Sequence, residues 1–252
     1  MEFDTQCASI GRRPLTLASS LTEYINRLKQ LFSSCCLCGQ KAERYNHLCR
    51  YCYHDLPTIN LPTSSPNLLS WPAINRLLAP YKFDELISVS NYIWPYDIWI
   101  KQLKYQHQFN YANLLGPLLA DHYNRHYGIT PDLSSPTVIS VPCHIKKWQQ
   151  RGFNQSHLLA QKFSKHLGLK YDPEMIVRLD EGKPQVGQSG ISRRKHKPKF
   201  ALTNENQTLP KHVVLIDDVV TTGTTANAIC RLLKSKGVHK VSLVTLCISL
   251  PF

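Results

Sequence analysis

The sequence of 252 residues lacks a long hydrophobic run: no apolar stretch approaches the roughly 18 residues that a membrane-spanning helix requires. Residues 1–20 lack the order of basic, apolar and small residues that marks a secretory signal. The chain also contains no internal repeat. We therefore expect a cytoplasmic protein with no membrane insertion and no repeat architecture.

Acidic residues are scarce. The chain has 17 Asp and Glu against 30 Lys and Arg, a formal net charge of +13. The excess is concentrated in residues 141–200, which contain 13 Lys and Arg and 4 Asp and Glu. A basic surplus of this density indicates a polyanionic partner, either the phosphates of a small ligand or a nucleic acid backbone. The alternative is a basic face that is merely solvated.

Disulfides are not expected, although the chain has nine cysteines, because a cytoplasmic location disfavours them. Four cysteines form two C-x-x-C pairs, and paired knuckles of this kind predict a metal site: Cys35, Cys38, Cys49 and Cys52. Four thiolates satisfy tetrahedral zinc completely, so the zinc is expected to be structural rather than catalytic. Cys36, His47 and His54 are alternative ligands. A redox role fits less well, because neither pair begins a helix after a strand.

The chain divides into four expected parts: an N-terminal tail with a short helix (1–33), a zinc ribbon (34–56), a proline-rich linker (57–80) and a larger domain (81–252). In the larger domain, apolar periodicity predicts alternating strands and helices. The expected strands are 86–93, 137–141, 174–179, 212–216 and 240–248, and the expected helices are 97–105, 111–127, 154–167 and 224–236. Residues 180–199 are expected to form a loop. This alternation predicts an α/β fold with a mostly parallel sheet and helices on both faces.

Two acids and a hydroxyl-rich loop follow the buried strand predicted at 212–216. Asp217 and Asp218 come first, and then a loop that opens the next helix, Thr221, Thr222, Gly223, Thr224 and Thr225. In parallel sheets, ligands bind beyond the carboxyl ends of the strands. The glycine, the hydroxyls and the free N–H groups at the helix start suit a monophosphate. The acids suit vicinal ribose hydroxyls and Mg²⁺. The alternative is an ordinary strand end and helix cap.

A second loop with basic residues follows the strand predicted at 137–141. His144, Lys147 and Arg151 lie in it, and their charges suit a pyrophosphate group at the same edge of the sheet. Asn154 is either part of this site or simply the N-cap of the following helix. Arg193 and Arg194, in the loop predicted at 180–199, are further candidates for the same role.

The order of strand, two acids, Thr-Thr-Gly-x-Thr and helix resembles the 5-phosphoribosyl-1-pyrophosphate (PRPP) signature of type I phosphoribosyltransferases. The resemblance implies that Asp217 and Asp218 bind the ribose and that residues 221–225 bind the 5-phosphate. Further motifs are Pro142, His144, Lys147, the Arg-Gly-Phe-Asn-Gln run at 151–155, the run at 188–195 and the cysteine pairs. Together with the PRPP signature, they make residues 35–252 look like the ComF/GntX family of competence-associated proteins. Two features depart from the family pattern. Cys143 replaces the family's usual aliphatic residue, and the stretch at 192–200 is several residues shorter than the corresponding stretch in the family.

Three functions compete at this point. The family resemblance implies a competence factor that binds PRPP or a related ligand and handles incoming single-stranded DNA with other DNA-uptake proteins. The second is a phosphoribosyltransferase that transfers phosphoribose from PRPP to a base and releases pyrophosphate. Such an enzyme needs a hood over the base. The chain stops four residues after the last predicted strand, so any hood has to come from the zinc ribbon and linker. A PRPP-sensing regulator is the third hypothesis, but no DNA-binding domain is recognisable.

Overall fold

The computed structural model describes residues 34–45, 47–60, 67–78, 80–127, 135–179, 199–206 and 208–249. The chain forms two compact units, residues 1–55 and 56–252. The short helix expected within residues 1–33 lies outside the described residues, as do Arg193 and Arg194. No helix in the described ranges has both the length and the apolar character needed to cross a membrane.

The smaller unit is built from two tight turns and a short helix. Isolated bridges join Ser34 to Lys41 and Arg44 to Leu48, and α2 (Arg50–His54) follows. Its hydrophobic interior is small, with Leu48, Ala42, Cys35 and Cys49 buried. A unit with so little core needs a further source of stability, such as a bound metal.

The larger unit contains a four-stranded sheet in the order β1 (Glu85–Asn91), β6 (Lys240–Ile248), β5 (His212–Val220), β2 (Thr137–Ser140). All neighbouring strands are parallel. The strands are almost wholly buried, which is typical of a parallel sheet covered on both faces. The prediction of a mostly parallel α/β fold is therefore confirmed.

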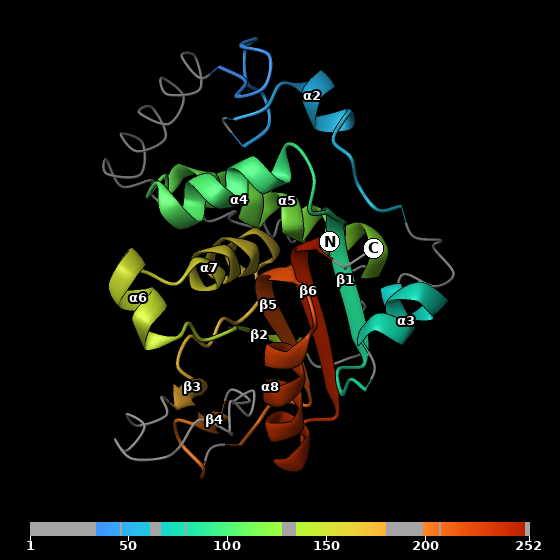
Figure 1. Cartoon of the computed structure of the whole chain (residues 1–252), viewed down its shortest axis with the longest axis vertical. Helices are drawn as coiled ribbons and strands as arrows, with labels where there is room; N and C mark the ends of the chain where they lie inside the picture. Colours follow the sequence, from blue (N-terminus) through green and yellow to red (C-terminus); the bar gives the residue numbers. More distant parts are fainter. Residues whose placement is uncertain are drawn as a thin grey trace, which may run out of the picture. The chain divides into compact units, whose positions relative to one another are not determined.

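Helices cover both faces of this sheet (Figure 1). On one face, α5 (Asn110–Tyr127) and α7 (Gln155–Leu167) pack together, and α4 (Tyr96–Tyr105) lies against α5. A Cβ atom at Gly116 would collide with Cβ of Lys162, so this glycine allows the close approach of α5 and α7. On the other face, α8 (Thr224–Ser235) contributes Ile229 and Leu233 to a core shared with strands β5 and β6.

The segment expected as a linker also contributes to this core. It forms a 3-10 helix, η1 (Leu68–Ser70), and a helix, α3 (Pro72–Leu78). Four of their apolar side chains, Leu68, Leu69, Ile74 and Leu78, are buried in the same cluster as α8. The proline content of this stretch suggests a linker. Burial of its leucines and isoleucine stabilises regular structure there instead.

Two further elements differ from the expectation. Residues 145–151, expected as a loop, form the helix α6 (Ile145–Arg151). The strand β3 (Ile176–Leu179) pairs with β4 (Lys199–Leu202) in a separate antiparallel pair. The sequence reasoning missed β4, because its four residues adjoin the polar stretch at 180–198.

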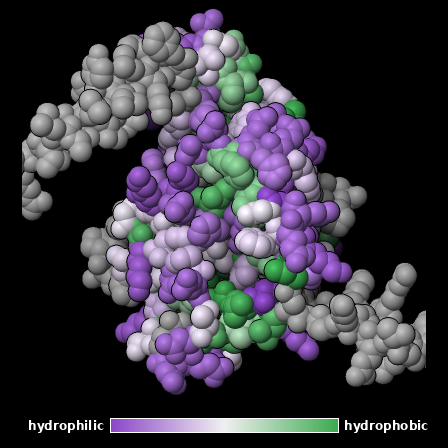
Figure 2. All heavy atoms as spheres, turned by 90° about the vertical axis from the view of Figure 1, so that its left-hand side faces the viewer, coloured by the Kyte–Doolittle hydropathy of each residue, from purple (hydrophilic) through white to green (hydrophobic). Residues whose placement is uncertain are grey.

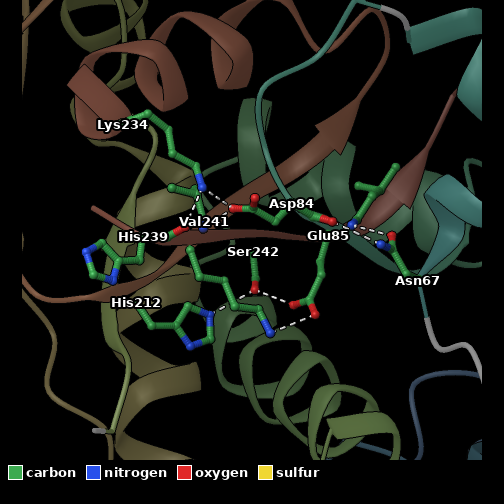
Figure 3. Close-up of polar contacts among 10 residues, drawn as sticks. Asn67, Asp84, Glu85, His212, Lys234, His239, Val241 and Ser242 are labelled. Atoms are coloured by element: carbon green, nitrogen blue, oxygen red, sulfur yellow. Dashed lines mark hydrogen bonds and ion pairs between the residues drawn. The ribbon is translucent and has the colours of Figure 1, made fainter. Parts of the chain in front are cut away.

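At the amino ends of the strands, a polar network joins β1, β5 and β6 (Figure 3). Ser242 Oγ donates to Glu85 Oε2 at 2.6 Å and lies 2.9 Å from His212 Nε2. Lys240 Nζ lies 2.7 Å from Glu85 Oε1. In a second ion pair, Lys234 Nζ lies 2.7 Å from Asp84 Oδ2, which also accepts the N–H of Val241. These contacts fix the strand starts, at the end of the sheet away from the site described next.

Candidate functional site

A polar pocket of about 410 Å³ opens at the carboxyl ends of the strands. It collects side chains from several segments: the ends of β1, β2 and β5, and α4, α6 and α7. The residues that line it are Tyr92, Lys104, Tyr105, Val141, Pro142, Cys143, His144, Lys147, Arg151, Asn154, Gln155, Ser156, Arg178, Asp217, Asp218, Val219, Thr221, Thr225 and Ser249. Most of the residues predicted separately from the acid pair and the basic loop therefore meet in one place.

The two acids lie within strand β5 rather than after it, because pairing with β6 continues to Val220. Asp217 Oδ1 accepts hydrogen bonds from Ser156 Oγ and from the N–H of Asp218, both at 2.9 Å. Burial raises the pKa of Asp217 to about 7, and the charge of Asp218 adds to the rise. Asp217 therefore holds a proton more readily than an exposed carboxyl does.

Asp218 has a different partner. Lys104, from α4, forms an ion pair with its Oδ2 atom. The two side chains are 17% and 7% exposed, so this pair is largely shielded from water. Burial alone would lower the pKa of Lys104, but the attraction of Asp218 outweighs it and the pKa is raised. A permanent cation therefore stands beside the second acid.

The hydroxyl loop lies between β5 and α8. Gly223 has φ of +65° and is the residue before the helix. This backbone conformation strains any residue with a side chain, and a Cβ there would also contact Leu78 and Phe83. Thr221 and Thr225 line the pocket, while the hydroxyls of Thr222 and Thr224 lie 2.9 Å apart. The unpaired N–H groups at the start of this 12-residue helix favour an anion.

The predicted cations lie on or beside α6. His144 is the N-cap of α6, where its Nδ1 accepts the N–H of Lys146 at 3.1 Å. Arg151 donates to Gln155 Oε1 at 3.1 Å and to the hydroxyl of Tyr105 at 3.3 Å. Together with Lys147, both line the pocket. Asn154 caps α7 and also donates to the carbonyl of Val141, so its alternative role as an N-cap is confirmed.

Sequence reasoning missed several residues of this pocket. The sequence around Lys104 favours a solvated helix face over a phosphate contact, and no pattern links α4 to β5. Ser156 and Arg178 belong to no motif. The one sequence signal that could have found these residues is a hydroxyl or basic side chain next to a predicted strand end, and this signal is weak.

The cysteines of the smaller unit converge as predicted. The sulfur atoms of Cys35, Cys38, Cys49 and Cys52 all lie within 4.8 Å of one another. Those of Cys38 and Cys49 are separated by 3.6 Å, and a tetrahedral zinc with Zn–S bonds of about 2.3 Å places sulfurs about 3.8 Å apart. The donor set therefore suits zinc. His47 and His54, considered as substitutes, are not members of this cluster.

Residues 154–249, which include much of the sheet and many residues of the pocket, match the phosphoribosyl transferase domain family. This match gives the class of protein. The chain is 33% identical over 217 residues to DNA utilization protein YhgH of Escherichia coli O157:H7, covering 84% of this chain and 89% of that protein. It is 30% identical over 219 residues to competence protein F of Haemophilus influenzae, covering 84% of this chain and 83% of that protein. The chain thus belongs to the competence protein F and YhgH family, as its resemblance implied.

Solved structures are more distant. The chain is similar to a hypoxanthine phosphoribosyltransferase from Staphylococcus aureus, with 19% identity, a TM-score of 0.30 and coverage of 56% of this chain and 62% of that chain. An adenine phosphoribosyltransferase from Thermoanaerobacter pseudethanolicus has 15% identity, a TM-score of 0.32 and coverage of 57% and 82%.

Proposed function

We propose that this protein binds PRPP, or a related phosphoribosyl ligand, and uses this site while handling incoming single-stranded DNA during natural transformation. The observation that carries the proposal is the pocket itself. It brings the acid pair of β5, the hydroxyl loop before α8 and the cations of α6 to one edge of the sheet.

Each part of PRPP has matching groups in this arrangement. Asp217 and Asp218 are proposed to accept the ribose hydroxyls, and the loop at 221–225 is proposed to offer N–H and hydroxyl donors to the 5-phosphate. His144, Lys147 and Arg151 provide positive charge for the pyrophosphate, and Arg193 and Arg194 are proposed to do the same. Mg²⁺ enters with PRPP, as oxygen-rich phosphate ligands favour it.

The DNA role is supported by the names of the relatives and by charge. One relative is called a DNA utilization protein and another competence protein F. This chain carries a net charge of +13, with a large share between residues 141 and 200, and such a surface attracts phosphate backbones. Other DNA-uptake proteins are its expected partners, and the cytoplasm is its expected location.

The four-cysteine cluster is proposed to hold structural zinc. All four donors are thiolates, so the metal has no open position for a substrate. Its contribution is to fold the smaller unit, whose core of Leu48, Ala42 and the buried cysteines is small.

A second candidate is a phosphoribosyltransferase of nucleobase salvage or biosynthesis. The specific observation that favours it is that the acid pair, the hydroxyl loop and the cations all border one open pocket. Transfer would break the bond from the anomeric carbon to pyrophosphate and form a bond from that carbon to a base nitrogen. The first proposal requires binding only, whereas this one requires turnover.

Calorimetry with PRPP and Mg²⁺ tests the shared site. Replacing both Asp217 and Asp218 with Ala should weaken binding at least tenfold, or about 1.4 kcal/mol, and equal affinities for the two proteins would contradict the site. Binding of fluorescent single-stranded DNA and release of pyrophosphate in the presence of each common base then separate the two candidates. DNA binding without release supports the competence factor, and release without DNA binding supports the enzyme.

A further inference from the structure

Beside the pocket, two hollows of about 610 and 380 Å³ open on the side of α6 and β3. The two hollows share five lining residues: Pro142, Cys143, Trp148, Pro173 and Ile176. We call the space around these residues the Trp148 groove. Pro142 and Cys143 also line the pocket of about 410 Å³ at the carboxyl ends of the strands, which we call the PRPP-type pocket. The groove therefore adjoins the site described above.

Trp148 is placed in a way that core packing does not explain. It lies on α6, a helix with no buried residue, and 51% of it is exposed. Ile145 and Val177, which line the larger hollow, are also exposed. Figure 1 shows α6 at the left, and Figure 2, which views the molecule from that side, shows hydrophobic side chains exposed between hydrophilic ones. Large apolar groups left in water near a site indicate a binding surface.

Charge distinguishes this groove from an ordinary apolar docking surface. On α6, Lys146 and Lys147 precede Trp148 in the sequence, Lys147 and Arg151 line the adjoining PRPP-type pocket, and the helix contains no acid. Arg178, on β3, lines both the larger hollow and the PRPP-type pocket. One acid, Glu174, lines the larger hollow. An exposed aromatic ring in the same hollow as an arginine, beside a pocket lined by further cations, is a combination that binds single-stranded nucleic acid, through base stacking and phosphate pairing.

We propose that the Trp148 groove binds one nucleotide of a single-stranded DNA, with the base against Trp148 and the adjacent phosphate at Arg178. This inference rests on the proposed DNA-handling function and names the surface that performs it. Because Arg178 belongs to both spaces, the DNA strand passes the entrance of the PRPP-type pocket, and the two ligands bind side by side.

The test uses the full-length protein and a fluorescein-labelled oligo(dT) of 20 nucleotides, titrated by anisotropy over a series of salt concentrations. Trp148→Ala should lower the affinity about tenfold at every salt concentration, because stacking does not depend on counterions. Trp148→Phe should recover most of the affinity. Trp94→Ala is the matched control, since Trp94 is 60% exposed and lines none of the three spaces. Arg178→Gln should instead reduce the slope of log affinity against log salt by about 0.7.

A second readout is independent of affinity. An oligo(dT) carrying 5-iododeoxyuridine should, on irradiation, cross-link to the tryptic peptide 148–151, which contains Trp148. Cross-links elsewhere, together with a Trp148→Ala protein that binds DNA as tightly as wild type, would overturn the groove while leaving the proposed function intact. Wild-type protein that binds no oligo(dT) would overturn both.

Discussion

Lys104 on α4 forms a buried ion pair with Asp218 on β5, two residues that are 114 positions apart in the sequence and belong to different layers of the fold. The pair neutralises one of the two acids that line the pocket. It also ties α4, which covers the sheet through α5, directly to the strand that carries the site. Stability and ligand binding should therefore both depend on Lys104.

Lys104→Met should lower the free energy of unfolding by about 3 kcal/mol, because it leaves the Asp218 carboxylate buried without its cation. Urea denaturation measures this loss. Lys101→Met is the control: Lys101 lies on the same helix and pairs with Asp97 at 2.9 Å, but it is exposed, so its loss should change stability far less than the loss of Lys104. Equal effects of the two changes would contradict the structural importance of the Lys104–Asp218 pair.

The raised pKa of Asp217 predicts a pH dependence of stability. Its pKa rises from 3.8 to about 7 in the folded protein, so the folded state holds a proton that the unfolded state has lost between these values. The proton on Asp217 therefore stabilises the folded state fully below about pH 4. As the pH rises towards 7, the free energy of unfolding falls by at most about 1.4 kcal/mol per pH unit. Asp217→Asn should flatten the profile over that range. An unchanged profile, measured by chemical denaturation, would show that Asp217 titrates normally.

The sequence predicted much of this site, because its residues stand in contiguous runs. Asp217, Asp218 and the loop at 221–225 directly follow the apolar run at 212–216, so local order alone indicated an anion site. Lys104 and Arg178 could not be found in the same way. Their positions depend on how α4 packs and on the pairing of β3 with β4, and these long-range contacts leave no periodic signal. Helix α6 was missed for a similar reason: it buries no residue, so it has no apolar stripe to detect.

The network at the amino ends of the strands should contribute to stability without affecting the site. Ser242→Ala removes the donor to Glu85 and the partner of His212 in a fully buried position. The loss should be about 1–3 kcal/mol. Ser235→Ala, at an exposed hydroxyl that donates to the carbonyl of Leu232, serves as control and should have little effect. Both variants should bind PRPP like wild type, and weakened binding by Ser242→Ala alone would show that the two ends of the sheet are coupled.

The basic run outside the described residues gives a further prediction about DNA. Changing Arg193, Arg194 and Lys195 together to Glu should weaken the binding of single-stranded DNA of every sequence about equally, because phosphate contacts carry no sequence information. The salt dependence should fall as well, by roughly 0.7 in log–log slope for each phosphate that the variant no longer neutralises. Anisotropy with homopolymers of different bases measures both effects, and transformation of the host should decrease. A weakening confined to one base would contradict a backbone contact.

Zinc content tests the smaller unit. The purified protein should contain one zinc ion per chain, held by the cluster that includes Cys38 and Cys49. Cys38→Ser should release the metal and unfold residues 34–55, because the unit has little other core. Cys36→Ser is a close control: Cys36 is exposed, lies between two members of the cluster and is not part of it, so this variant should keep its zinc. Elemental analysis and limited proteolysis measure the two effects. Wild-type protein without zinc, or equal loss from both variants, would contradict the assignment of the four ligands.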